Sequence, residues 1–412
     1  MKFTGYQTFV VAVLAFLQFT IVLDFMILSP LGALLLQELH ITTAQFGLVV
    51  SAYAFSAGLS GILAAGFADK FDRKKLLMFF YSGFIVGTLL CGVASDYHML
   101  LVARVVTGLF GGVIGSISFA IIADLFPFEM RGRVMGFVQT AFAASQVMGI
   151  PVGLYLSNHW GWHSPFLMIV AAALLVWFVL LFRLQPIDAH LKVPSEQNPI
   201  KHIVATVSQP RYLWAFLTTM LLSTGGFMLM PFGSTFSVHN LGISLGRLPL
   251  VYMVTGISAM VVGPLLGRLS DAIGKYRVFL AGSLVCTVII VIYCTRGITP
   301  IEVVILLNVL LFACIMARVI SSQSLLSAVP AMKDRGAFMA INAAIQQLSG
   351  GVAASIAGLI VVQTPGGQLD RYDVLGYVVC AAVLCTIGLM YKVNAQLAAA
   401  GTETAPRPAP AR

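Results

Sequence analysis

Long apolar stretches alternate with short polar connections along the whole chain. Twelve stretches are long and apolar enough to cross a bilayer as an α-helix, which takes about 20 residues. None shows the two-residue alternation expected of a transmembrane β-strand. The predicted spans are 8–36, 44–67, 76–95, 99–124, 134–157, 164–184, 212–238, 246–268, 278–296, 301–325, 337–363 and 373–396. The pattern therefore predicts an all-α polytopic membrane protein with 12 transmembrane helices.

The composition agrees with this prediction and argues against an enzyme. The chain is 59% hydrophobic and 9% charged, whereas soluble domains carry about 25% charged residues. All six cysteines fall inside predicted spans without a Cys-x-x-Cys pair, so we expect neither disulfides nor a metal site. The sequence has no nucleotide-binding loop and no serine–histidine, metal-ligand or paired-acid set. We therefore expect no catalytic site and no cofactor.

Basic residues are distributed unevenly between the two sides of the predicted helices. With loops assigned alternately, 19 of the 24 lysines and arginines fall on the side that carries both chain ends. Because positive charge favours the cytoplasmic side, we predict cytoplasmic termini and a location in the inner (plasma) membrane of a bacterium. The same asymmetry accounts for the net charge of +9, so nucleic acid is not expected as a partner.

Two short polar loops each occur twice. An aspartate followed by basic residues lies in 65–75 and returns 202 residues later in 267–277. An Arg-Gly pair that begins at Arg131 returns after 204 residues at Arg335. Two loops repeated at nearly the same offset indicate a parallel internal repeat. The chain is therefore predicted to form two pseudo-symmetric six-helix bundles.

The longest connection between spans separates these two bundles. We assign residues 1–184 to the N-terminal bundle and 212–397 to the C-terminal bundle. The segment 185–211, which contains four prolines, is predicted to be a cytoplasmic linker. The proline-rich, polar residues 398–412 are predicted to be a disordered cytoplasmic tail.

These loops and two motifs inside predicted spans resemble the major facilitator superfamily over nearly the whole chain. The family's loop between helices 2 and 3 has the pattern Gly-x-x-x-Asp-(Arg/Lys)-x-Gly-x-(Arg/Lys)-(Arg/Lys). The first copy matches it at Asp69, Lys70, Lys74 and Lys75, and the second at Gly267, Asp271, Gly274 and Arg277. In helix 4, Arg104 to Gly108 resembles Arg-x-x-Gln-Gly. In helix 5, Gly149, Pro151 and Gly153 resemble the glycine–proline motif of proton-driven exporters and are predicted to kink the helix.

The two copies of the loop depart from the family pattern in different ways. The first copy has Ala65 and Asp72 in place of the two glycines. The second keeps both glycines but has Ala272 and Tyr276 in place of basic residues. We therefore predict that charge removal in the first copy impairs transport more than a change of Asp271.

The resemblance implies that this loop forms a cytoplasmic gate. Asp69 would lie near the amino end of helix 11, and Arg73 would pair with Asp124 at the end of helix 4. In the second copy, Asp271 and Arg277 would take the corresponding roles. Such contacts can hold the two bundles together and must break when access changes. The alternative is a static surface ion pair, which stabilises by about 0–1 kcal/mol.

Asp24 is the one acid placed well inside a predicted span. An ionised carboxylate is costly in hydrocarbon, so it must face a cavity, find a partner or take up a proton. We favour a role in proton coupling, with Arg104 as a proton-linked arginine, as the resemblance implies. Recognition of a cationic substrate and a permanent structural pair remain alternatives for Asp24, as does interaction of Arg104 with lipid headgroups.

Arg318 is a second basic residue inside a span and matches no motif of the family. It is predicted either to bind an anionic group of the substrate or to pair with Asp24. The two residues differ in predicted depth by about 12 Å at 1.5 Å per residue, which argues against direct pairing.

Further polar and aromatic residues recur at helical spacing inside the spans. Gln139 and Gln146 are predicted to share one face of helix 5, and Asn342 and Gln346 one face of helix 11. These residues either line a substrate cavity or join helices by hydrogen bonds. Phe227 in helix 7 is a further candidate for the cavity, and lipid contact is its alternative.

Taken with the resemblance, the sequence predicts a secondary active transporter that works by alternating access. The branch it resembles most, the 12-helix drug:proton antiporters, implies export of a small amphiphilic compound, drug or metabolite in exchange for protons. The alternative is a proton-coupled symporter for uptake of a sugar or an organic anion. The expected partners are the small-molecule substrate, protons and membrane lipid, and we expect a monomer driven by the proton gradient.

Overall fold

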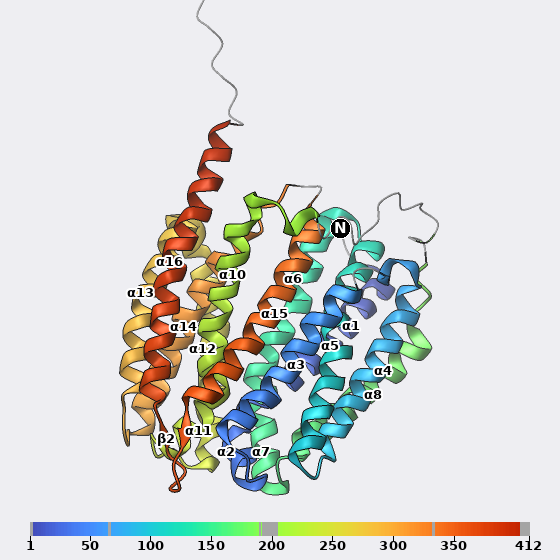
Figure 1. Ribbon diagram of the computed structural model, residues 1–412. Helices are drawn as coiled ribbons and strands as arrows, with labels where there is room; N and C mark the ends of the chain where they lie inside the picture. The colour runs from blue at the N-terminus through green and yellow to red at the C-terminus, as the bar shows by residue number, and fades with distance from the viewer. Residues whose placement is uncertain (1–2, 65–66, 189–190, 192–204, 332–333, 404–412) are drawn as a thin grey trace, which may run out of the picture.

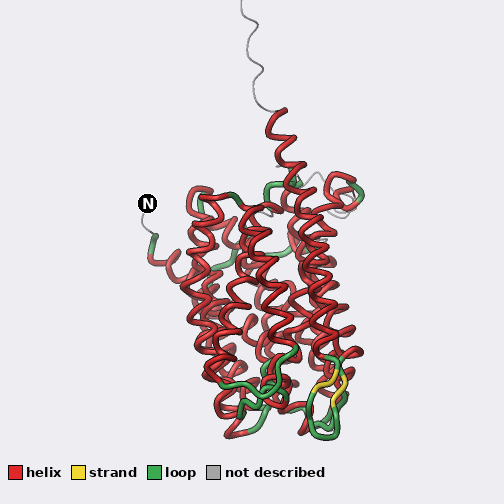
Figure 2. The backbone as a smooth tube through the Cα atoms, turned by 90° about the vertical axis from the view of Figure 1, so that its left-hand side faces the viewer, coloured by secondary structure: helices red, strands yellow, loops and turns green. Residues whose placement is uncertain are grey.

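The computed structural model describes residues 3–64, 67–188, 191, 205–331 and 334–403. In this part of the chain, 12 helices are long and apolar enough to cross a membrane. They stand side by side, with both described chain ends toward the same end of the molecule (Figures 1 and 2). We call this the terminal end, and the opposite one, which carries a short β-hairpin, the hairpin end. The predicted all-α membrane fold with 12 spans is confirmed.

The first bundle has six spans, of which the first and the fifth are divided into shorter elements. They are α1 (Gly5–Ile27) with α2 (Gly32–Glu38), α3 (Thr43–Ala64), α4 (Arg73–Gly92), α5 (Tyr97–Leu125), α6 (Phe128–Ala144) with η2 (Ser145–Gly149) and α7 (Ile150–Trp160), and α8 (Ser164–Arg183). A 3-10 turn, η1 (Ala68–Lys70), precedes α4. Within the bundle, α1 packs against α6 and α8, and α5 packs against α3 and α4.

The second bundle repeats this order of spans. It contains α10 (Pro210–Leu229) with η4 (Met230–Phe232) and α11 (Gly233–His239), then η5 (Leu245–Arg247), α12 (Leu248–Ile273), α13 (Lys275–Cys294), α14 (Ile301–Leu326), α15 (Arg335–Ile360) and α16 (Tyr372–Glu403). The antiparallel strands β1 (Val362–Gln363) and β2 (Leu369–Asp370) join α15 to α16.

The chain beyond the second bundle differs from the prediction. We predicted residues 398–403 to be disordered, but helix α16 continues through them. The reason is that three consecutive alanines follow Leu397, and alanine is the strongest helix former. The rest of the predicted tail, 404–412, lies outside the described residues, as do 189–190 and 192–204 of the predicted linker.

Proline divides the first span of each bundle at corresponding places. Pro30 lies in the turn between α1 and α2, and Pro231 lies in η4 between α10 and α11. Proline lacks the N–H that an α-helix needs and clashes with the preceding turn. The two prolines are 201 residues apart, so the break follows the internal repeat. The single predicted spans 8–36 and 212–238 are therefore each two helices.

Small residues bring the two bundles into contact at the hairpin end. Helix α3 packs against α15, and a Cβ added to Gly47 would lie 2.8 Å from the carbonyl oxygen of Ala354. The Thr43 hydroxyl donates to the carbonyl of Val361 at 2.6 Å, and the hydroxyls of Ser51 and Ser355 are 2.7 Å apart. We call this contact between α3 and α15 the seam.

The divided helices add a second contact between the bundles at the hairpin end. The Ser29 hydroxyl donates to the carbonyl of Met230, and the Ser234 hydroxyl donates to the carbonyl of Ser29 at 2.8 Å. Both bonds join the break after α1 to the break after α10. They complement the seam, so the hairpin end is closed by backbone and small side chains.

The same face of α15 is exposed toward the terminal end. Gly351, Ala354 and Gly358 are buried on the face that packs against α3. Contact with α3 continues to Leu348 and Ala344, which lie 2.9 and 3.4 Å from a Cβ added to Gly58, whereas Ala340, one turn further toward the terminal end, is exposed. This helical face is thus covered by the other bundle as far as Ala344 and uncovered beyond it. The bundles separate toward the terminal end.

Candidate functional site

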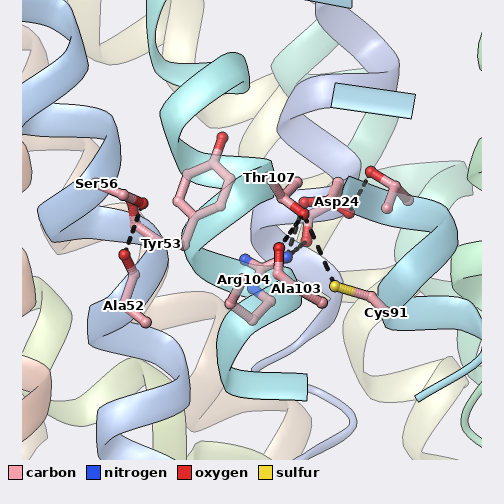
Figure 3. A network of polar contacts seen from close by, with 9 residues as sticks. Asp24, Ala52, Tyr53, Ser56, Cys91, Ala103, Arg104 and Thr107 are labelled. Carbon is pink, nitrogen blue, oxygen red and sulfur yellow. Dashed lines mark hydrogen bonds and ion pairs between the residues drawn. The ribbon is translucent and has the colours of Figure 1, made fainter. Parts of the chain in front are cut away.

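A buried ion pair joins α1 to α5 in the first bundle. Arg104 Nη1 lies 2.8 Å from Asp24 Oδ2, and the two side chains are 1% and 0% exposed. The Thr88 hydroxyl, from α4, donates to Asp24 Oδ1 at 3.2 Å. Both carboxylate oxygens therefore have a partner, and three helices converge on one acid. Figure 3 shows Asp24 and Arg104 facing each other within this cluster.

Tyr53 of α3 completes the surroundings of the arginine. The guanidinium carbon of Arg104 lies 4.6 Å from the centre of the Tyr53 ring, a cation–π distance. Arg104 Nε forms no hydrogen bond to any described residue. The arginine is therefore compensated by one carboxylate, one ring and the carbonyl of Asp24, at 3.5 Å from Nη1. Loss of the carboxylate charge would leave it without an anionic partner.

The helix 5 motif allows α1 to approach closely beside Asp24. A Cβ added to Gly149 would lie 2.6 Å from Leu23 Cδ1, and one added to Gly153 would lie 2.7 Å from Ile27 Cδ1. Such small residues four apart let membrane helices pack at short distance. The π-helical turn η2 ends at Gly149, two residues before Pro151, and the kink at these residues stays a prediction. The two glycines of the motif thus lie against the helix that carries Asp24.

The first copy of the repeated loop contains the ion pair that the resemblance implied. Arg73 Nε lies 3.2 Å from Asp124 Oδ2, and Arg73 Nη1 donates to the carbonyl of Ala68 at 3.2 Å. Both charged residues belong to the first bundle, so this pair joins α4 to α5 and does not itself latch the two bundles. The side chain of Asp69 lies outside the described part of the structure. A gating role stays a prediction.

The second copy forms a different contact. Asp271 pairs with Lys275 at 3.7 Å, and the side chain of Asp271 is 76% exposed. Arg277 is exposed and forms no ion pair with the residues that the structure describes. The retained glycine, Gly274, has φ +102° at the end of α12, a conformation that residues with a Cβ rarely adopt. The two copies therefore differ in structure as well as in sequence.

Asp72 occupies the place of that glycine in the first copy and has a different role. With φ −55° it caps α4, because its side chain accepts from Lys75 N at 2.9 Å. Its second oxygen accepts from Ile187 N at 2.9 Å, and Arg73 N donates to the carbonyl of Ile187 at 3.0 Å. The loop thus binds the start of the segment that leaves the first bundle.

Arg318 lies inside the second bundle and does not pair with Asp24. Its side chain is 4% exposed. Nε donates to Ser283 Oγ and Nη2 donates to Thr386 Oγ1, each at 3.2 Å. The Phe279 ring lies beside the guanidinium, with 5.9 Å between its centre and the Arg318 Cζ. Within the described chain its partners are thus neutral residues of α13 and α16.

The predicted polar stripes separate into buried and exposed members. Gln146 is buried in η2 beside Gly256 of α12, whereas Gln139 is exposed. The two glutamines differ in exposure because η2 packs against α12 and covers Gln146. That they share one helical face stays a prediction. Asn342 is buried and accepts from the Thr219 hydroxyl at 2.5 Å.

Gln346 and Phe227 complete the predicted cavity residues. Gln346 is exposed on α15. The Phe227 ring lies 5.8 Å from the ring of Phe25, which lies 5.3 Å from that of Tyr53. Phe227 therefore contacts the first bundle rather than facing lipid alone. A row of aromatic rings connects it to the surroundings of Arg104.

The seam is the functional feature that sequence reasoning missed. Its signal was present as Thr43, Gly47 and Ser51, which are small residues at four-residue spacing. Such a stripe is typical of close helix contacts in membranes. It does not reveal the partner helix, which lies about 300 residues away in sequence.

Comparison with known proteins places these features in a family. The sequence matches the Major Facilitator Superfamily over residues 14–355. It is 29% identical to the uncharacterized MFS-type transporter YceJ of Bacillus subtilis over 269 residues, which is 65% of this chain and 68% of that protein. It is 24% identical to the multidrug resistance protein MdtG of Klebsiella pneumoniae over 377 residues, covering 89% of this chain and 90% of MdtG.

Other relatives and solved structures agree on the fold. A probable sugar efflux transporter of Mannheimia succiniciproducens is 24% identical and covers 54% of this chain and 55% of that protein. The crystal structure of a bacterial homologue of the human lysosomal transporter Spinster superposes with a TM-score of 0.72, at 16% identity and full coverage of both chains. The nucleoside transporter NupG gives a TM-score of 0.75 at 13% identity, covering 94% of this chain and 99% of NupG.

Proposed function

The chain belongs to the major facilitator superfamily, and from this premise we propose that it is a proton-coupled antiporter that exports a small amphiphilic compound from a bacterial cell by alternating access. It is an integral membrane transporter and not an enzyme. Relatives named for multidrug resistance and for sugar efflux support export as its direction. The observation that carries proton coupling is the ion pair between Asp24 and Arg104, buried where three helices meet.

We assign the terminal end to the cytoplasm. Most basic residues fall on the side that carries both termini, and positive charge favours the cytoplasmic side of the inner membrane. With this orientation, the bundles separate toward the cytoplasm and the seam closes the opposite side. The described conformation is then the one that loads substrate from the cell. Transport also requires a state in which the seam is open.

The buried pair supplies the coupling step. Entry of a proton onto Asp24 neutralises the carboxylate and leaves the Arg104 guanidinium without its anion. A buried charge without a partner is costly, so protonation raises the free energy of the present arrangement of α1 and α5 and favours a different one. Departure of the proton restores the attraction and the closed pair. Because α1 continues through the Pro30 break to the contacts at Met230 and Ser234, a shift of α1 reaches the closed end.

Substrate binding belongs between the bundles. The exposed inner face of α15 and the Phe227 ring, which contacts Phe25, border the region where they separate. Neither face needs a cofactor, because the energy comes from the proton gradient. The partners we propose are the exported compound, protons and lipid, with one chain as the transporting unit.

Transport in liposomes tests the proposal. Purified protein is reconstituted with a pH-sensitive dye inside, a pH gradient is imposed, and dyes, sugars and organic anions are added singly. We expect a transported compound to cross the membrane in the direction opposite to the protons. The dye should then report a change of the internal pH when that compound is added. Movement of compound and protons in the same direction would refute antiport and establish uptake by symport. Asp24→Asn should abolish gradient-driven movement, whereas Glu302→Gln, at an exposed acid, should not.

A further inference from the structure

The second bundle holds a buried cation that has no anionic partner among the described residues. Arg318 is 4% exposed, nearly as buried as Arg104 at 1%. Arg104 pairs with Asp24 at 2.8 Å. Arg318 instead donates to the hydroxyls of Ser283 and Thr386, and no described carboxylate forms an ion pair with it. The two arginines therefore differ in charge compensation and not in depth of burial.

The acidic residues of the described second bundle lie only near helix ends. They are Asp271, Glu302, Asp334, Asp370, Asp373 and Glu403. None is therefore placed to form an ion pair with Arg318 from the interior of a helix. The thiols of Cys286 and Cys314 are the other polar groups beside the guanidinium. Buried charges in membrane proteins are paired or mark a path for substrate or ions. The missing anion must then come from outside the described contacts.

One edge of the guanidinium has no oxygen acceptor among the described residues. Nε and Nη2 donate to the two hydroxyls, whereas Nη1 donates to no oxygen of a described residue, and the Cys286 thiol is a further polar group beside the guanidinium. A Cβ added to Gly225 of α10 would lie 3.9 Å from Nη1, so no side chain of α10 covers this edge at that point. Gly226 follows with open space at its own Cβ position. Phe279, Val379 and Val383 supply an apolar border.

The position of Arg318 suits loading from the open end. It lies eight residues before the end of α14 at Leu326, which corresponds to about 12 Å of helix. This is the half of the molecule in which the bundles separate. An anion that enters from the terminal end would therefore encounter Arg318 before the deeper pair of Asp24 and Arg104.

We propose that Arg318 binds the negatively charged group of the exported compound, and that this compound is an organic anion with an apolar body. The inference rests on the proposed export function and narrows its substrate. An inside-negative membrane potential would favour departure of such an anion. Departure of an anion and entry of a proton both move net positive charge into the cell, so the membrane potential would favour both steps of the exchange.

Binding of matched probes tests this assignment without a proton gradient. The full-length protein in lipid nanodiscs is titrated with 2-naphthoate, 2-naphthylmethanol and 2-naphthylmethylammonium, which share an aromatic body and differ in charge. We expect binding of naphthoate only. Arg318→Gln should weaken it by about tenfold or more, the loss expected for a charge-assisted hydrogen bond. Arg318→Lys should retain part of the affinity, and Arg247→Gln, in the exposed η5 turn, should match the parent protein.

A second variant keeps the test valid if Arg318→Gln fails to fold. Gly225→Ala adds a methyl group 3.9 Å from Nη1 and 3.8 Å from its nearest carbon neighbours, so it fits and narrows the space at this edge of the guanidinium. It should weaken naphthoate binding more than the control Gly226→Ala.

Three outcomes would overturn the assignment. They are equal binding of all three probes, unchanged naphthoate binding in both Arg318→Gln and Gly225→Ala, and full occupancy of the site by chloride alone at equal ionic strength. The last would identify a site for an inorganic ion. The binding assay needs no pH gradient, so its result does not depend on whether the protein is a proton antiporter. The assignment of Arg318 and the proposal of proton antiport can therefore be refuted separately.

Discussion

The pair of Asp24 and Arg104 makes a quantitative prediction about stability. Asp24→Asn removes the one carboxylate of a guanidinium that is 1% exposed and whose Nε already lacks a partner among the described residues. Removal of one member of a buried pair costs about 3–5 kcal/mol, because it leaves an uncompensated charge. Arg104→Gln instead leaves the carboxyl group of Asp24 buried without its guanidinium partner. A carboxyl can be neutralised by a proton, whereas a guanidinium cannot.

The two single variants should therefore differ in their response to pH. We expect Arg104→Gln to lose less stability than Asp24→Asn, and to recover stability as the pH falls because proton uptake removes the unpaired charge. Asp24→Asn should show no such recovery. The double variant should be more stable than Asp24→Asn, since neither charge remains. Thr88→Val, which removes only the hydroxyl bond to Asp24, should cost about 1 kcal/mol.

Reversible unfolding in mixed detergent micelles, followed by circular dichroism at several pH values, measures these differences as a double-mutant cycle. A coupling energy below about 1 kcal/mol, as found for exposed pairs, would refute the reasoning. Equal pH responses of the two single variants would also refute it, because the pair would then not control the charge state of Asp24.

Three further predictions concern the seam, the repeated loop and a helix cap. Gly47→Val should force α3 away from α15, since even a Cβ would lie 2.8 Å from the Ala354 carbonyl oxygen. A cysteine introduced at Ser355 should then react faster with an impermeant thiol reagent added outside. An unchanged reaction rate would contradict a tight seam. Arg73→Gln should lower the transport rate and melting temperature more than Asp271→Asn, because Arg73 is buried in its pair whereas Asp271 is exposed; equal effects would remove the distinction between the copies. The N–H groups of Met99 and His98 lower the pKa of Asp96, the N-cap of α5, so its contribution to stability is present above the ordinary pKa of aspartate, about 3.9, and is lost as the pH falls through the lower folded value. Asp96→Asn should cap the helix without that pH dependence, and melting curves at acid pH measure the difference.

Hydropathy and internal repetition were sufficient to predict the fold. A span of apolar residues in lipid has few alternatives to a helix, because every backbone group must be satisfied internally. The repeated loops indicated two bundles before any contact was known. What hydropathy could not show was interruption within a span. Pro30 and Pro231 lie inside continuous apolar sequence, and at both breaks serine hydroxyls bond to carbonyl groups across the two bundles, a contact that hydropathy does not predict.

The site was predictable in its residues but less so in its pairings. Asp24 and Arg104 stand out in sequence because charges are rare in spans, yet they are separated by 80 positions, and spacing says nothing about contact at that range. Gln139 and Gln146 differ in exposure because only Gln146 is covered by α12 of the other bundle, and the sequence of one helix does not show which part of it another bundle covers. Arg318 shows the opposite case: its sequence marks it as unusual, and only its neutral neighbours show that its charge lacks an anion.

Asp72 gives the asymmetry of the repeat a meaning that the motif alone conceals. Judged by the family pattern, aspartate at this position is a lost glycine. In the structure, its two oxygens bind Lys75 N and Ile187 N, so it caps α4 and also fastens the chain that leaves the first bundle. At the corresponding place in the second copy, Gly274 ends α12 with φ +102° and has no side chain that could accept such bonds. The two equivalent positions therefore do different work: Asp72 fixes the chain that leaves the first bundle, whereas Gly274 allows the turn that ends α12.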